Sequence, residues 1–102
     1  MRWVLPVVLV LAGCTPAVRP VTPAVVASAG ARGVPADAAR LEAGRATYVR
    51  ACGSCHQLYP TDAYDGPGWI ESVRTMAPKA KLTPDQAALV RDYLLAAHHV
   101  AE

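Results

Sequence analysis

Residues 51–56 read Ala-Cys-Gly-Ser-Cys-His, and this short stretch decides how the rest of the chain is interpreted. Cys52 and Cys55 are separated by two residues, and His56 follows at once. The pattern Cys-x-x-Cys-His is typical of covalent attachment of a c-type haem. On one turn of chain, each thiol can add to one vinyl group of the porphyrin, and the next side chain then faces the iron. The sequence therefore predicts one covalent haem c, bound through Cys52 and Cys55 with His56 as an iron ligand.

Three other sites share the Cys-x-x-Cys spacing: a zinc site, a thioredoxin-like redox pair and a structural disulfide. A four-ligand zinc site would have to recruit His98 and His99, but adjacent residues on a helix point about 100° apart. A thioredoxin-like pair follows a strand in a βαβ unit, whereas the flanks here have helical patterns. A disulfide leaves His56 without a role. The histidine thus favours haem over all three alternatives.

Length and charge restrict the remaining possibilities. The chain has 102 residues, with ten Lys and Arg against eight Asp and Glu, a net charge of +2. This balance excludes a strongly basic nucleic-acid-binding surface, and the length allows one domain. Residues 38–102 contain few large apolar side chains. So small a domain is expected to need a covalent staple or a bound group to complete its core.

Two helical patterns flank the central part of the chain. Before and within the cysteine pair, residues at every third or fourth position share one helix face: Leu41, Gly44, Tyr48, Cys52 and Cys55. Asp37 is placed to cap the start of this helix. Residues 83–86 read Thr-Pro-Asp-Gln, which is a capping box with proline at the first helical position. The helix that they begin is expected to bury Leu89, Val90, Tyr93, Leu94 and Ala97.

A third, shorter helix is expected between these two. Residues 64–68 predict a turn, after which Trp69, Val73 and Met76 lie on one helix face. Pro78 disfavours helical geometry at the preceding residue, so this helix should end near Met76. Because the patterned segments are all helical, the sequence predicts an all-α fold.

The N-terminus has the pattern of a secretory signal. Arg2 precedes the apolar run at residues 3–12, which is too short to cross a hydrocarbon core of about 30 Å. Residues 11–14 read Leu-Ala-Gly-Cys and resemble the lipobox of bacterial lipoproteins. The resemblance implies that residues 1–13 are removed and that Cys14 carries the lipid, and several acyl chains anchor a protein stably. An ordinary signal peptide with a chance cysteine is the alternative.

The segment that follows Cys14 contains four prolines, at positions 16, 20, 23 and 35. This spacing predicts neither helix nor strand, so we expect residues 14–37 to be the lipidated cysteine and a Pro/Ala/Val-rich tether. Such a coil spans roughly 25 to 30 Å. The valines in this segment leave a buried, extended arm as the alternative. Residues 38–102 would then be the haem domain.

Residues 41–97 resemble a small class I cytochrome c. Residues 41–52 are similar to that family's N-terminal helix and residues 88–94 to its C-terminal helix. In the family these helices cross beside the haem, with a small residue at the crossing. The resemblance implies a small cytochrome c-like fold of three to four helices around one covalently bound haem.

The second axial ligand decides between an electron carrier and a haem that binds other molecules. Met76 is the single methionine after residue 1, and the sequence Met-Ala-Pro at 76–78 resembles the family's ligand loop. A thioether ligand favours ferrous iron and raises the reduction potential. The alternatives are His98 or His99 as the second ligand, an open site, or Met76 as a plain core side chain.

Smaller expectations concern the surroundings of the haem. A backbone carbonyl in residues 58–60 is the candidate partner for the other ring nitrogen of His56. Tyr59, Tyr64 and Trp69 are candidates for packing on the macrocycle or for donating to a propionate. Three cations, Arg74, Lys79 and Lys81, form either a basic rim for an acidic partner or an ordinary solvated face.

These features predict a membrane-anchored monohaem c-type cytochrome that carries single electrons between redox proteins. It is not expected to be an enzyme by itself, although it can serve as a subunit of a redox complex. Its expected location is the bacterial cell envelope, facing the periplasm or the outer surface, with the membrane contacted through the lipid on Cys14. No nucleic-acid partner is expected. The alternative function is a haem-based small-ligand binder or sensor with an open or bis-histidine site.

Overall fold

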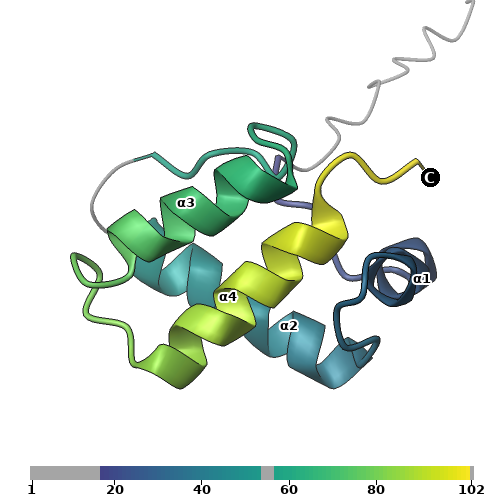
Figure 1. Cartoon of the computed structure of the whole chain (residues 1–102), viewed down its shortest axis with the longest axis horizontal. Coiled ribbons are helices and arrows are strands. Elements are labelled where there is room, and N and C mark those ends of the chain that lie inside the picture. The colour runs from purple at the N-terminus through teal and green to yellow at the C-terminus, as the bar shows by residue number, and fades with distance from the viewer. Residues whose placement is uncertain (1–16, 54–56, 102) are drawn as a thin grey trace, which may run out of the picture.

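The computed structural model describes residues 17–53 and 57–101, and Cys14, Cys55 and His56 lie outside these ranges. In the described residues all regular structure is helical, which confirms the all-α prediction. The elements are α1 (Pro23–Ala31), α2 (Ala38–Thr47), a π-helical turn η1 (Tyr48–Cys52), α3 (Gly66–Met76) and α4 (Pro84–Ala97). Figure 1 shows α2 and α3 on either side of α4.

Helix α2 begins where the sequence predicts. Asp37 caps it, because its carboxylate accepts hydrogen bonds from the backbone amides of Ala39 (2.9 Å) and Arg40 (3.2 Å). The last turn before the first cysteine differs from the prediction, since it is the π-helical turn η1 rather than α-helix. Such wide turns occur often at functional sites.

Helix α4 also begins at its predicted capping box. Thr83 Oγ1 accepts from the Gln86 amide (3.2 Å), and Gln86 Oε1 accepts from the Thr83 amide (2.9 Å). Four of the five residues predicted to be buried on α4 are buried, and Leu89 is half-buried. Periodicity and capping were therefore sufficient to define this element.

Helices α2 and α4 cross at Gly44. A Cβ atom at this position would lie 2.2 Å from the Leu89 carbonyl oxygen and 2.8 Å from the Tyr93 Cβ. These distances leave no room for a side chain, so the two backbones meet directly. A small residue here agrees with what the resemblance implied for the crossing.

Helix α3 begins earlier than predicted. Asp65 caps it through the Gly68 amide (2.9 Å), so residues 66–68 form its first turn instead of belonging to a preceding turn. Pro67 is tolerated because the backbone N–H groups of a helix's first turn have no acceptor within the helix. The N–H that proline lacks therefore costs no hydrogen bond there. The helix ends at Met76, as predicted.

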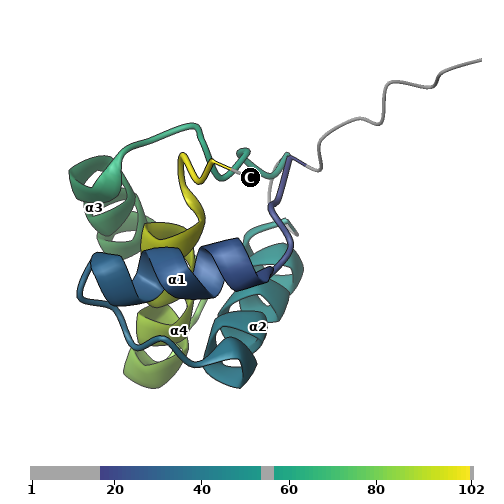
Figure 2. The same ribbon diagram turned by 90° about the vertical axis from the view of Figure 1, so that its right-hand side faces the viewer.

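The expected tether is wrong for residues 17–37. Residues 23–31 form α1, and Val25 and Ala29 are completely buried. Figure 2 shows α1 lying across the molecule near α4, with which it is in contact. The prolines do not prevent this helix because Pro23 begins it and Pro35 comes after its end, leaving residues 24–34 without one. The alternative of a buried arm was right about burial, but the arm is helical rather than extended.

Ahead of α1, residues 17–21 form a strap along the folded body. Arg19 within it is 9% exposed, and its Nε donates to the Ala97 carbonyl oxygen at the end of α4 (3.0 Å). The same guanidinium pairs with the Asp62 carboxylate (3.1 Å). Arg32 donates to the carbonyl oxygens of Leu95 (2.9 Å) and His98 (2.7 Å). The last turn of α4 holds no basic residue of its own, so these two arginines cover its carbonyl end.

The Arg19–Asp62 pair predicts a pH-dependent contribution to stability. Burial works against ionisation of Asp62, but the hydrogen bond from the His99 amide and the charge of Arg19 together hold the pKa of this carboxyl below its ordinary value. A carboxyl with a lowered pKa stabilises the fold above its unfolded pKa, and this contribution is lost as the pH falls through the folded pKa. The Asp62 side chain is 45% exposed, so solvent screening keeps the effect modest.

Asp62→Asn is therefore expected to lower the urea midpoint near pH 7, and the difference between the two proteins should shrink as the pH falls through the lowered pKa of the folded carboxyl. Urea titrations of both proteins across this range test the expectation. Equal differences at both ends of the range would contradict it. Asp85→Asn, at an exposed position in the first turn of α4, is the control for the loss of one negative charge.

Candidate functional site

An apolar cavity of about 270 Å³ lies between η1, α3, α4 and the connecting segments that follow η1 and α3. Its lining is dominated by aliphatic side chains, including Leu58, Val73, Ala77, Leu82, Val90 and Leu94. Ligand pockets in proteins have this character, with few polar groups placed among apolar walls. The cavity is the candidate site.

Cys52 and Met76 both line this cavity. Cys52 is the last residue of η1, and Met76 is the last residue of α3. Of the four residues predicted to hold a haem, these two are described, and the fold brings them together. The predictions for Cys55 and His56 fall outside the described residues.

The residues present fit a porphyrin. A macrocycle needs apolar walls, a thiol at the wall for a thioether bond and a donor for the iron, and the described part of the cavity supplies each of these. Within residues 17–53 and 57–101, no three His, Cys, Asp or Glu side chains are grouped as a metal site. The described residues therefore do not support the alternative of a zinc site.

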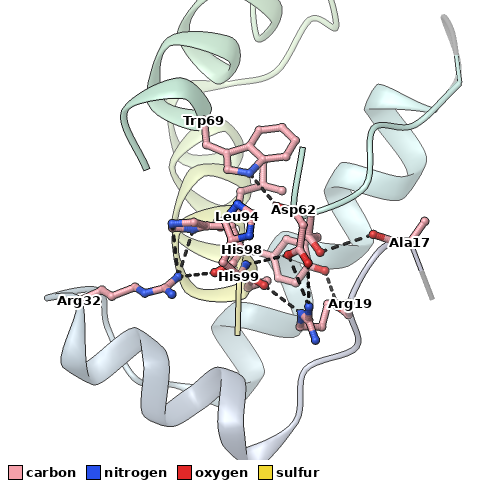
Figure 3. A network of polar contacts seen from close by, with 11 residues as sticks. Ala17, Arg19, Arg32, Asp62, Trp69, Leu94, His98 and His99 are labelled. Atoms are coloured by element: carbon pink, nitrogen blue, oxygen red, sulfur yellow. Dashed lines mark hydrogen bonds and ion pairs between the residues drawn. The ribbon is translucent and has the colours of Figure 1, made fainter. Parts of the chain in front are cut away.

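His98 and His99 lie just beyond α4, and neither lines the cavity. The His98 ring contacts the Leu94 carbonyl oxygen (3.0 Å) and the Arg32 guanidinium (3.1 Å). The backbone amide of His99 donates to Asp62 (2.7 Å). Figure 3 shows both histidines in this polar network. Their position does not support either one as an iron ligand.

Tyr48 holds the segment that follows the cysteine motif. Its hydroxyl donates to the Tyr59 carbonyl oxygen (2.6 Å), and its ring is 3% exposed. Burial raises the pKa of this hydroxyl well above its ordinary value. Tyr48 therefore remains a hydrogen-bond donor at neutral pH. Helical spacing placed Tyr48 on the correct face but did not indicate this role.

Trp69 forms one wall of the cavity and is 1% exposed. Its Nε1 donates to the Thr61 carbonyl oxygen (2.9 Å), so this N–H already has a protein partner and is not directed at a propionate. Its ring makes edge contacts with Tyr48 (6.0 Å between centroids) and Tyr64 (5.0 Å). Tyr59 also lines the cavity, whereas Tyr64 lies outside it.

The three predicted rim cations have different surroundings. Lys79 lines the cavity. Arg74 is exposed and pairs with Glu71 on the same helix (2.5 Å), and Lys81 is exposed. The solvated-face interpretation thus suits Arg74 and Lys81, and Lys79 alone among the three belongs to the site.

Gly53 is a site residue that the sequence analysis did not single out. It lies between the two cysteines, and a Cβ there would be 2.6 Å from the Val49 carbonyl oxygen. The chain leaving η1 therefore has no room for a side chain at this position. The close approach arises from the π-helical turn, which spacing alone did not predict.

In the part of the chain that the structure describes, no helix combines the length and apolar character needed to cross a bilayer. Comparisons of the chain with protein-family models, with curated proteins and with solved structures found no match.

Proposed function

We propose that the protein is a lipid-anchored monohaem c-type cytochrome that carries single electrons between redox partners in the bacterial cell envelope. The observation that supports this most strongly is that Cys52 of the Cys-x-x-Cys-His sequence and Met76 line one apolar cavity. A bare sequence motif does not require such a cavity. Neither a thiol redox pair nor a disulfide explains it.

In this proposal Cys52 and Cys55 would hold the porphyrin covalently, and His56 and Met76 would ligate the iron. A bound haem supplies an iron that exchanges one electron between the ferric and ferrous states. The aliphatic walls of the cavity exclude water from the group they surround, which influences its potential. Lys79 is the one charged side chain among the described cavity residues.

Expression of the full chain in a host with cytochrome-maturation machinery tests the proposal. The protein should carry one haem that resists acid–acetone extraction, give a pyridine haemochrome spectrum and gain the mass of a haem on residues 52 and 55. Colourless protein that is nevertheless compact and melts cooperatively would overturn it.

Met76→Leu tests the iron ligand. We expect the ferric protein to lose the weak long-wavelength band that the resemblance implies for Met-ligated haem. The potential should fall by a sizeable part of the roughly 0.8 V range that axial ligands span. The ferrous variant should also bind CO readily. Leu82→Met, a volume-conserving change at another cavity residue, is the control and should keep the band. An unchanged spectrum in Met76→Leu would show that Met76 is not the iron ligand.

One observation favours a second candidate function, a haem-based small-ligand binder. Met76 also lines an open groove of about 570 Å³ on its outer side, together with Tyr59, Tyr64 and Thr75. Solvent space therefore reaches the proposed ligand from outside. Immediate CO binding by the unmodified ferrous protein would support this function, whereas slow or absent binding supports the electron carrier.

A further inference from the structure

Ala17, three residues after the proposed lipid attachment site, is bonded to the folded body. The Thr61 amide donates to the carbonyl oxygen of Ala17 (2.9 Å), and the Thr61 side chain contacts the same oxygen (3.4 Å). Thr61 is only 2% exposed, so this contact joins the strap to the interior. Figure 3 shows Ala17 beside the chain that carries Asp62.

The next two carbonyl groups of the strap are held as well. The Arg45 guanidinium of α2 donates to the carbonyl oxygens of Val18 (3.2 Å) and Arg19 (3.3 Å). The buried hydroxyl of Tyr93 on α4 also donates to the Arg19 carbonyl oxygen. Burial raises the pKa of this hydroxyl to about 12, so it donates at any physiological pH. Three successive carbonyl groups are thus bonded to two helices and a loop, which makes the strap part of the rigid body.

At Ala17 the strap lies at one corner of the folded body, which it forms with Thr61, Asp62 and His99. The contacts of Asp62 with Arg19 and with the His99 amide (2.7 Å) join the three chain segments there. We call this the anchor corner. Helix α3 starts close to it, since Trp69 in the first turns of α3 donates to the Thr61 carbonyl oxygen.

We infer that the anchor corner lies against the lipid bilayer and that the Met76 end of the cavity points away from it. The inference rests on the proposed lipidation of Cys14. The Cα atoms of residues 14 and 17 are separated by three peptide steps, which reach at most about 11 Å. A coil of the full predicted tether would reach roughly 25 to 30 Å and would allow the domain to take any orientation. The strap removes that freedom.

This orientation identifies the side from which a redox partner approaches. Helix α3 has 11 residues from its start near the anchor corner to Met76, a length of about 16 Å. The cavity lies along this helix, so its Met76 end is up to that distance farther from the bilayer than the anchor corner. A partner that exchanges electrons there must reach the membrane-distal end, and the bilayer occupies the opposite face.

The test uses the lipidated, haem-loaded full chain in vesicles of phosphatidylethanolamine and phosphatidylglycerol. Nitroxide labels are attached to Ala63→Cys, next to the anchor corner, and to Asp85→Cys, at the far end of α4. Both positions are exposed, and in the proposed mature protein the native cysteines carry lipid or haem. A Ni(II)-chelating lipid in the vesicles relaxes nearby nitroxides, and the haem is kept reduced. We expect several-fold stronger relaxation at position 63 than at position 85.

Inserting about twelve Gly and Ser residues between Thr15 and Pro16 restores a flexible tether and should remove the difference between the two labels. Equal relaxation of the two labels without the insertion, on protein whose Cys14 lipid is verified by mass spectrometry, would overturn the inference alone. Stronger relaxation at position 85 would do the same. Absence of lipid on Cys14 would overturn both the inference and the proposed anchoring. The haem spectrum is independent of the lipid, so it would still test the proposed electron carrier.

Discussion

Cys52→Ala combined with Cys55→Ala is expected to abolish covalent haem attachment completely. Without either thiol no thioether can form, so any haem retained in the cavity should be removed by acid–acetone extraction. The cavity walls would then lose their apolar contents, and a domain this small has little other core to compensate. We therefore expect the thermal midpoint to fall well below that of the haem-loaded protein.

The pyridine haemochrome assay, the intact mass and a thermal melt followed by circular dichroism measure these effects. Cys14→Ser is the matched control, because it removes a cysteine outside the motif. It should release the protein from the membrane while leaving the haem in place. Haem that resists extraction from the double variant would show that the motif is not the attachment site.

Gly44→Ala is expected to lower the free energy of unfolding by about 3 kcal/mol or more. The new Cβ would lie 2.2 Å from the Leu89 carbonyl oxygen, which is backbone and cannot rotate away. Helices α2 and α4 would have to separate. Leu94 of α4 lines the cavity, and α2 continues directly into η1, whose Cys52 also lines it. The haem site should therefore be disturbed along with stability.

Gly30→Ala in α1 is the control for the change in helix propensity. A Cβ at Gly30 would meet its nearest neighbour, Ala36, at 3.7 Å, which is an ordinary contact. Replacing glycine by alanine inside a helix there is expected to stabilise the protein by roughly 0.5 to 1 kcal/mol. Denaturant titrations compare the two variants. Similar midpoints for the two variants would show that the close crossing at Gly44 does not exclude a larger residue there.

The elements that the sequence predicted well are those defined by interactions between residues close in the chain. The caps at Asp37 and Thr83 each act over two or three residues. Helix α3 ends at Met76 shortly before Pro78, which has no N–H to continue the helical hydrogen bonds, although Ala77 itself keeps helical geometry. The juxtaposition of Cys52 and Met76 followed from the helix faces on which they were placed, together with the resemblance that suggested how those helices pack.

The tether prediction was wrong at α1, because the effect of a proline depends on where it falls relative to a helix. Proline disrupts the interior of a helix but is compatible with its first turn. Thr22 caps α1 through the Val25 amide (3.3 Å), and Pro23 follows it directly. The residues around this start are sufficient to indicate a helix, but the burial of Val25 and Ala29 depends on α4, which lies far along the chain.

The sequence by itself determined the cysteine–histidine motif, the ends of α2 and α4 and the all-helical character of the protein, because each depends on residue type and on spacings of a few positions. Tertiary structure alone decided that residues 17–19 become a fixed strap and that Arg19 reaches Asp62 and Ala97, partners 43 and 78 residues away. From its neighbours in the sequence alone, a charged side chain beside prolines is expected to be exposed to solvent. It is buried here because a carboxylate and the carbonyl end of α4 meet at one corner, and together they compensate the cost of removing its charge from water.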